Sequence, residues 1–412
     1  MSFRMVISGI GAVTPIGAST ATYWDAVRKG VSGLGWISRF DLTDYPCRVG
    51  GEVHDIDIAE HVLPRIAVQT DRWTQLGLVA AGQALEDSGH RTPGECPYDT
   101  AVITASSSGG NEFGQREIHK LWSDGPHAVG AYQSIAWFYA ATTGQIAIKH
   151  GAKGPCGVLA TESAGGLDAI GASRRALRRG EVRAVVTGAT EAPISPYALA
   201  CQLRGGRLSL VDDPMTAYQP FSATAAGHVV GEGGAMLLVE ELSRALGRGA
   251  ERIYAEVVGY AATHDGRPTT VRPTGDGLAR AARVAIADAG VRPDDVDAVF
   301  ADGAATPELD QAEVAALRAV FGARQVPICL PKTLVGRMYA GSPALDVATA
   351  ALALYHGELP PSPVVEKAPW ASDLDLVHEL RAADLRHVVV LARGYGGFNA
   401  AVVLRRLGNN EN

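Results

Sequence analysis

One segment of this sequence combines a potential nucleophile with the kind of turn that would activate it. Residues 157–160 form a short apolar run that is typical of a buried strand. Leu167, Ile170 and Leu177 then recur at roughly helical spacing. Ser163 is therefore predicted at a strand-to-helix turn, where a helix N-terminus offers N–H groups to a developing oxyanion. A cysteine there would become a strong nucleophile, whereas a serine needs an adjacent general base, normally histidine, before it attacks an acyl group.

Two later turns are places where such a base could stand, and neither contains histidine. The first turn follows the apolar residues 299–301 and begins with Asp302. The second follows the apolar run 326–330 and carries Lys332 and Arg337. The sequence therefore combines the backbone pattern of a catalytic site with side chains that do not complete it.

The three segments resemble the motifs of the β-ketoacyl synthases, in the thiolase superfamily, in their order, spacing and flanking glycines. Those enzymes read approximately T-x-C-x-S-G-L-D, A-H-G-T-G-T and K-x-x-x-G-H, so their cysteine and two histidines correspond here to Ser163, Asp302 and Arg337. All three replacements together resemble the chain length factors, the ketosynthase beta subunits of type II polyketide synthases. In these proteins the strand-to-helix turn that carries the nucleophile in the synthases, the nucleophile elbow, typically reads A-E-Q-A-G-G-L-D. The match includes Glu162-x-Ala-Gly-Gly-Leu-Asp168, Pro307-Glu-Leu-Asp310, Gly231-Glu-Gly-Gly234 and Ala392-Arg-Gly-x-x-Gly-Phe-Asn399, and it runs from Gly9 to the last predicted strand.

This resemblance implies a subunit without catalysis of its own. Ser163 stands where the subfamily usually has glutamine, a residue once credited with decarboxylating malonyl groups, so that role is not expected here. Ser163 is instead expected to cap its helix by accepting a hydrogen bond from a first-turn N–H. Asp302 and Arg337 are expected to form an ion pair and not an acid-base pair, and Lys332 is expected to persist as an ion-pair partner. The resemblance implies no cofactor and no metal.

The resemblance also implies a role for the segment 109–122. In chain length factors it is the helix that gates a tunnel at the interface with a catalytic ketosynthase alpha subunit, and the poly-β-ketone grows into that tunnel. The resemblance to the family places Asn111, Gly114 and Ile118 at the gate, where octaketide members of the family have bulkier aromatic side chains. Smaller side chains predict a longer cavity, and so a product longer than an octaketide. The alternative is that these residues only pack the interface, with neighbours filling the lost volume. The aromatics of residues 131–140 are expected in the interface core.

The elements that would position these residues follow an α/β pattern. Strand-like runs alternate with helical stretches at 5–10, 100–105, 158–160 and 184–187, and again at 254–259, 297–301, 327–330 and 387–392. The second half repeats the first in outline, which resembles the internal duplication of the thiolase fold. The apolar residues 343–355 are expected to form a helix buried between sheets. We therefore predict a five-layer αβαβα sandwich with halves 1–245 and 246–412, where the first half holds the degenerate elbow and the gate helix. The break near residues 240–252 carries no flexible linker.

Composition limits the partners and the compartment. The chain has 412 residues, 47% of them hydrophobic, and a net charge of −7 without a basic stripe, which argues against a nucleic-acid partner. Four arginines are expected to form the solvated face of one helix, with an acidic acyl carrier protein bearing malonyl or polyketide groups as the alternative contact: Arg174, Arg175, Arg178 and Arg179. No apolar run is long enough for a membrane span, and no signal peptide is recognisable, so a cytoplasmic protein is expected.

The five cysteines are odd in number and contain no C-x-x-C pair, which disfavours a disulfide framework and a zinc site. They are expected to be buried small hydrophobes.

Other functions fit parts of the pattern. A malonyl decarboxylase or acyltransferase that uses Ser163 would need a base outside the motifs, such as His228 or His264. A serine hydrolase is disfavoured because Thr161 breaks the G-x-S-x-G pattern. The glycine-rich residues 394–398 follow a strand, but they lead into another predicted strand and not into the helix that a nucleotide loop requires. The beta subunit of a reducing, polyene-forming type II system stays open as an alternative.

Overall fold

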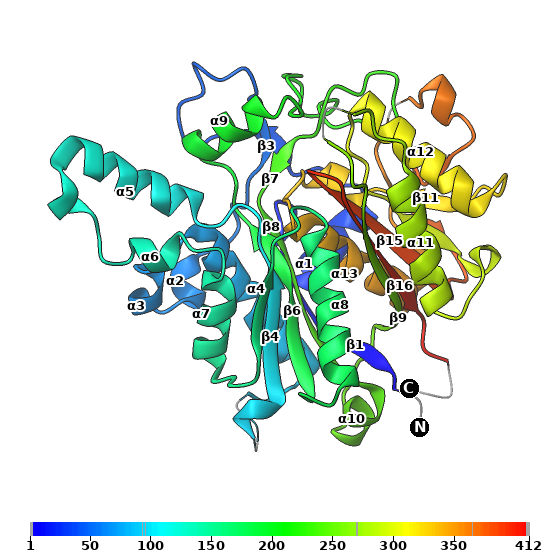
Figure 1. The fold of residues 1–412 in the computed structure, drawn as a ribbon, viewed down its shortest axis with the longest axis horizontal. Coiled ribbons are helices and arrows are strands. Elements are labelled where there is room, and N and C mark those ends of the chain that lie inside the picture. Colours follow the sequence, from blue (N-terminus) through cyan, green and yellow to red (C-terminus); the bar gives the residue numbers. More distant parts are fainter. Residues whose placement is uncertain (1–2, 93, 95, 269–270, 365, 409–412) are drawn as a thin grey trace.

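The sheet at the centre of the molecule runs through both halves of the chain (Figure 1). The computed structural model describes residues 3–92, 94, 96–268, 271–364 and 366–408, and within these the sheet has eleven strands in the order β13-β11-β10-β15-β16-β9-β1-β8-β6-β4-β5. The first half contributes β1 (Met5–Val13), β4 (Thr100–Ala105), β5 (Cys156–Leu159), β6 (Ala184–Glu191) and β8 (Gly233–Glu241). The second half contributes β9 (Ala255–His264), β10 (Ala298–Phe300), β11 (Pro327–Cys329), β13 (Asp375–Leu376), β15 (His387–Gly394) and β16 (Phe398–Arg405).

The two halves have the same topology. In each half, the five main strands lie side by side in the order third, second, fourth, fifth, first along the chain. The second strand of each half, β4 or β10, is parallel to both of its neighbours, and the last and first strands are added antiparallel. Within the described part of the eleven-stranded sheet, the halves join where residues 5–7 of β1 pair with residues 255–257 of β9. The predicted internal duplication is therefore confirmed.

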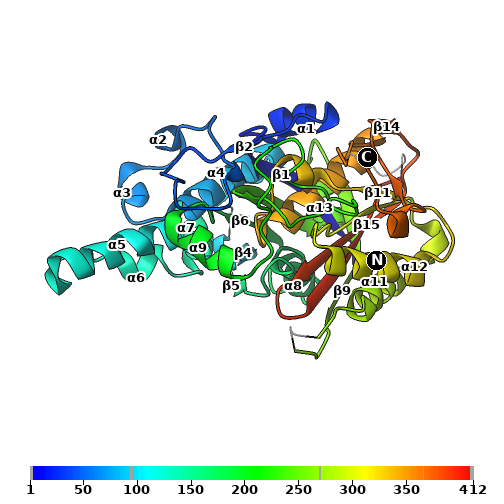
Figure 2. The ribbon, with the colours of Figure 1, turned by 90° about the horizontal axis from the view of Figure 1, so that it is seen from above.

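Helices lie in three layers around this sheet (Figures 1 and 2). The central layer consists of α8 (Gly165–Arg178) and α13 (Gly341–His356), and α13 contacts both β8 of the first half and β15 of the second. The outer layers are α4 (Arg72–Ser88) with α7 (Ala141–His150), and α11 (Asp276–Asp288) with α12 (Pro307–Phe321). Helix α13 is buried from Gly341 to Leu354, because the first-half strands of the sheet cover one side of it and the second-half strands cover the other. The five-layer sandwich is confirmed.

The remaining elements decorate this core. They are α1 (Thr20–Arg28), α2 (Ile58–His61), α3 (Pro64–Ala67), α5 (Asn111–Asp124), α6 (Gln133–Ala136), α9 (Pro196–Arg204) and α10 (Leu242–Gly247), with the short strands β2 (Leu34–Trp36), β3 (Val49–Gly51), β7 (Val230–Gly231), β12 (Glu358–Leu359) and β14 (Arg381–Ala382). Helix α5 projects from the body of the molecule as an arm, with α6 beside it (Figure 1). The part of the chain that the structure describes has no helix long and apolar enough to cross a membrane.

Two details differ from the sequence-based expectations. Strand β8 was not among the predicted runs, because it begins with two glycines at positive φ that look like a turn in the sequence. The cysteine prediction is correct for Cys47 and Cys329 but wrong for Cys96, Cys156 and Cys201, which are exposed. Cys156 is exposed because it opens β5, the edge strand of the sheet.

Candidate functional site

The elbow forms where it was predicted, between β5 and α8. Ser163 is buried, and Glu162 before it has φ of 50°, a left-handed conformation that is uncommon for a residue with a side chain. The Oγ of Ser163 has no hydrogen-bond partner among the described residues. The expected helix cap is wrong, because the turn extends one residue further: Ala164 occupies the N-cap position of α8 and makes no side-chain cap.

Asp302 and Arg337 meet as an ion pair. Arg337 Nη2 lies 3.0 Å from Asp302 Oδ1, and the same nitrogen donates to the carbonyl oxygen of Arg393 at 2.9 Å. The side chains of Arg337 and Asp302 are both largely buried. Asp302 follows β10 and Arg337 follows the 3₁₀ turn η4 (Pro331–Leu334), so the ends of two parallel neighbours, β10 and β11, bring the pair together.

The pair belongs to a wider buried network of opposite charges. Arg393 Nη2 lies 3.3 Å from Asp302 Oδ2 and 2.9 Å from Glu313 Oε2. The backbone N–H of Arg393 also donates to Asp302 Oδ1 at 3.0 Å. Burial alone would raise the pKa of Asp302, but the positive charges of Arg337, Arg393 and Lys332 outweigh it and hold the pKa well below its ordinary value. Asp302 is therefore an ionised structural partner and a poor proton donor.

Lys332 pairs next to this network, as expected. Its Nζ lies 2.6 Å from Asp346 Oδ2 on α13, and both side chains are fully buried. The two groups together contain three cations and three carboxylates, which match in number: Lys332, Arg337 and Arg393 with Asp302, Glu313 and Asp346.

Neither histidine that could have activated Ser163 is suited to that task. Desolvation lowers the pKa of His228 to about 3, and the positive charges of Arg337 and Arg207 add to the shift. A group with that pKa is a weak base near neutral pH. His264 is exposed at the end of β9, where its Nδ1 accepts the N–H of Gly266 at 2.9 Å.

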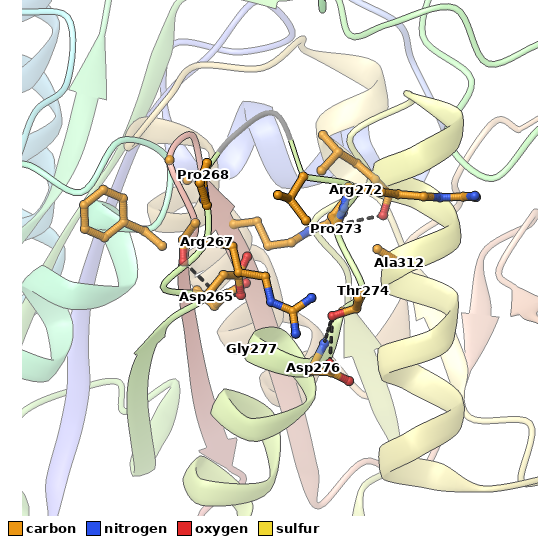
Figure 3. A pocket seen from close by; sticks show the side chains of 18 of the residues that line it. Asp265, Arg267, Pro268, Arg272, Pro273, Thr274, Asp276, Gly277 and Ala312 are labelled. Carbon is orange, nitrogen blue, oxygen red and sulfur yellow. Dashed lines mark hydrogen bonds between the residues drawn. The ribbon is translucent and has the colours of Figure 1, made fainter.

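A cavity of about 430 Å³ lies in front of the ion pair. Its lining includes Glu162, His228, Asp302, Arg337 and Tyr339. A neighbouring hollow of about 260 Å³ lies between the first turn of α11, marked by Asp276 and Gly277, and Ala312 on α12 (Figure 3). The two spaces share several lining residues: Arg207, Leu309, Arg393 and Gly394. The second hollow is also lined by Arg267, Arg272 and Arg280, so the degenerate site adjoins an arginine-rich surface.

Strained backbone has persisted around this site. The non-glycine residues with positive φ in the described ranges are Glu162, Phe221, Ala305 and Tyr339. Two of them are held by one carboxylate, because Asp310 accepts the N–H of Phe221 at 2.8 Å and the N–H of Ala305 at 3.0 Å. Such conformations cluster at functional sites, where the surrounding structure holds them. Two of the four, Glu162 and Tyr339, line the 430 Å³ cavity.

The three residues predicted to form the gate lie on the arm helix, apart from the cavity. Asn111, Gly114 and Ile118 have the spacing of one helix face, and none of them is among the described residues that line the 430 Å³ cavity. Gly114 is buried, and a Cβ added there would lie 2.8 Å from Cδ1 of Trp137. Ile118 is 47% exposed. At Gly114, the aromatic neighbour Trp137 therefore already fills the space that a side chain would take.

Sequence reasoning missed the partners that complete the network. Glu313 and Asp346 lie inside helical stretches whose sequence reveals only helical periodicity, and their pairing depends on the packing of α12 and α13. Arg393 was within a recognised motif, but nothing in that motif shows that its guanidinium would contact Asp302, 91 residues earlier in the chain.

Comparison with known proteins defines the family. The model of the β-ketoacyl synthase N-terminal domain matches residues 2–245, and the model of the C-terminal domain matches residues 254–366. The chain is 49% identical to the tetracenomycin polyketide synthase ketoacyl synthase beta subunit of Streptomyces glaucescens, over 98% of both chains. Among solved structures, the ishigamide ketosynthase/chain length factor superposes with a TM-score of 0.92 at 29% identity, covering 99% of this chain and 100% of the other.

A second solved structure contains a type II polyketide synthase acyl carrier protein in complex with its ketosynthase bound to the hexaketide. It matches with a TM-score of 0.89 at 25% identity, covering 99% of this chain and 100% of the other. The chain therefore belongs to the β-ketoacyl synthase family, and within it to the ketosynthase beta subunits, or chain length factors, of type II polyketide synthases.

Proposed function

We propose that this chain has no ketosynthase activity of its own and sets product length beside a catalytic ketosynthase alpha subunit. The observation that carries the proposal is the state of the three motif positions. Asp302 and Arg337 neutralise each other, and Ser163 is buried with an Oγ that has no partner among the described residues. An acyl transfer by Ser163 would need a base to take its proton, and His228 is held far from the required pKa.

Helix α5 and the segment after it, which includes α6, supply a surface that suits such a partner. Eight large apolar side chains are exposed between residues 118 and 139: Ile118, Leu121, Trp122, Tyr132, Ile135, Trp137, Phe138 and Tyr139. A monomeric protein rarely exposes a contiguous apolar patch of that kind, which is typical of a protein interface. Strand β5 adds an edge of the sheet, since β4 is its neighbour on one side only in the described sheet. We infer that the ketosynthase covers these two features.

Three of these eight side chains, Ile118, Leu121 and Trp122, lie on the same helix α5 as the gate positions Asn111, Gly114 and Ile118, so the pairing surface adjoins the length-determining residues. We propose that the polyketide tunnel runs along this helix at the interface and accepts a product longer than an octaketide. Trp137 limits the gain at Gly114, because its ring fills the space beside the glycine. The additional room would come mainly from Asn111 and Ile118.

Two further proposals concern the carrier protein and the division of the chain. An acidic acyl carrier protein that delivers malonyl and polyketide groups would be favoured by the arginine-rich hollow beside the degenerate site. We also propose residues 1–245 and 246–412 as the two halves. The matches to the two family models support a division in this region, which is occupied by α10.

Reconstitution tests the proposed function. This chain, its cognate ketosynthase and a malonyl-loaded carrier protein are combined, and each subunit is also assayed alone. We expect polyketide only when both subunits are present, and none when the ketosynthase lacks its nucleophilic cysteine. Polyketide from this chain alone, or an equal yield and length from the ketosynthase alone, would contradict the proposal. The released product also distinguishes a poly-β-ketone from a reduced polyene.

A further inference from the structure

The first turn of the arm helix is held by a carboxylate from another helix. The N-cap residue of α5, Gly110, offers no side-chain cap. Instead, Asp71 Oδ2 accepts the N–H of Phe113 at 2.6 Å, while Asp71 Oδ1 accepts the N–H of Trp73 at 3.2 Å. The first N–H groups of any α-helix lack partners within the helix. The buried carboxylate of Asp71 supplies such a partner to both α4 and α5, and so caps both helices.

A second link reaches the same turn from the sheet. Arg39 donates through Nη1 to Glu232 at 2.8 Å and through Nη2 to Glu112 in the first turn of α5. Glu232 is fully buried between β7 and β8, and it also accepts from Nη2 of Arg72 at 2.7 Å and from the N–H of Val53 at 2.9 Å. The relay Glu232–Arg39–Glu112 thus connects the rigid sheet to the start of the arm.

The other contacts of the helix among the described residues are to peripheral segments, where Gln115 accepts the N–H of Tyr197 on α9 at 2.9 Å and Glu117 accepts the N–H of Gly130. Beyond Gly114, only Glu117 is buried on α5, and the helix packs against α6, α9 and the 3₁₀ turn η2 (Pro126–Ala128), with no extensive contact to the sheet. Ile118 lies seven residues after Asn111, or about 10 Å along the axis. A tilt of about 10° at the first turn would therefore move Ile118 by roughly 2 Å, which is comparable to the size of a methyl group.

We propose that Asp71 and the Glu232–Arg39–Glu112 relay are positioning elements that aim the arm helix, and that they set product length together with the gate side chains. This inference rests on the proposed function, because it assumes that the tunnel runs along α5. It adds residues that act on product length through the orientation of the helix.

Two variants separate the links. Asp71→Asn keeps the size of the side chain but presents an NH₂ group to one of the two N–H donors. Glu112→Gln is milder, since it keeps an oxygen that can accept from Arg39 but removes the charge on the arm side of the relay, and it leaves Arg39 paired with Glu232. The matched control for the first is Asp87→Asn, which lies on the same α4 helix and accepts the N–H of Ile10 at 2.9 Å without contacting α5. The control for the second is Arg381→Met, which breaks an ion pair in the second half.

The measurement is the distribution of product lengths from the reconstituted heterodimer. Losing one charge-assisted hydrogen bond shifts a local equilibrium about tenfold, so the fraction of off-length product should rise about tenfold in Asp71→Asn. It should rise less in Glu112→Gln, where only the charge is removed, and stay constant in both controls. Hydrogen exchange at the Phe113 amide should accelerate by a similar factor in Asp71→Asn, which reports on the anchor independently of product. Unchanged lengths in folded, paired Glu112→Gln and Asp71→Asn would overturn the proposal.

A gate variant distinguishes this failure from failure of the proposed function. Asn111→Phe is assayed in parallel in the otherwise unchanged chain. If Asn111→Phe changes product length while the anchor variants do not, the anchor proposal is wrong and the gate stands. If none of the three variants changes length, the tunnel does not follow α5 and both proposals are wrong.

Discussion

Breaking the buried ion pair between Asp302 and Arg337 tests whether these two residues stabilise the fold and take no part in the chemistry. Arg337→Met removes the donors to Asp302 Oδ1 at 3.0 Å and to the carbonyl oxygen of Arg393 at 2.9 Å. Removing one partner of a buried ion pair costs about 3–5 kcal/mol, because the other charge stays buried without compensation. Arg393 still lies 3.3 Å from Asp302, so we expect a loss near the lower end of that range, about 3 kcal/mol.

The double variant Asp302→Asn, Arg337→Met should recover most of this loss, since replacing both buried charges is often close to neutral. The control is Arg318→Met, whose 2.6 Å ion pair with Asp373 is about half exposed and should contribute below about 1 kcal/mol. Urea unfolding of the purified heterodimers gives the stabilities, and product yield per folded heterodimer gives the activity. We expect near-normal yield from the folded double variant.

Two results would refute this reasoning. If Arg337→Met costs no more than Arg318→Met, the network does not stabilise the fold. If the double variant is folded and paired with the ketosynthase but makes no product, Asp302 and Arg337 take part in the chemistry.

Ser163→Ala should leave product yield and thermal stability nearly unchanged, because the Oγ lacks a partner among the described residues; loss of all product in a folded variant would contradict this. Asn111→Phe should shorten the product and Trp137→Ala, which empties the space beside Gly114, should lengthen it, as measured by mass spectrometry, and unchanged lengths would refute the gate assignment. Burial raises the pKa of Glu191 from 4.5 to about 8. The unfolded chain thus releases this proton first, and stability should fall as pH rises from about 4.5 to about 8. Glu191→Gln should weaken that fall in the urea midpoint, and parallel profiles would count against it.

Much of the fold was predictable because its signals are local. The bounds predicted for β4 match the structure, and the buried helix predicted at 343–355 lies inside α13. Apolar runs between turn residues mark strands that are covered on both faces by helices. The duplicated order of the strands was visible only in outline, since pairing such as that of β1 with β9 depends on contacts between distant segments.

The site was predictable in its positions and less so in its contacts. The motif spacing located Ser163, Asp302 and Arg337, and opposite charge alone predicted that the last two would pair. The cap predicted for Ser163 failed because it depends on where α8 begins, and a shift of one residue decides which side chain faces the first N–H groups. The contacts of Glu232 were equally unpredictable. Its motif is recognisable in the sequence, but its ion pair with Arg39, which links it to α5, depends on the fold.

The measurement that tests the central claim most directly is the intact mass of both subunits. This chain and its co-expressed ketosynthase are incubated with malonyl-loaded carrier protein, and each subunit is then weighed by mass spectrometry. If this chain is a non-catalytic chain length factor, acyl adducts will appear only on the ketosynthase. An adduct on this chain that disappears in the Ser163→Ala variant would contradict the account and make the chain an acyltransferase in its own right.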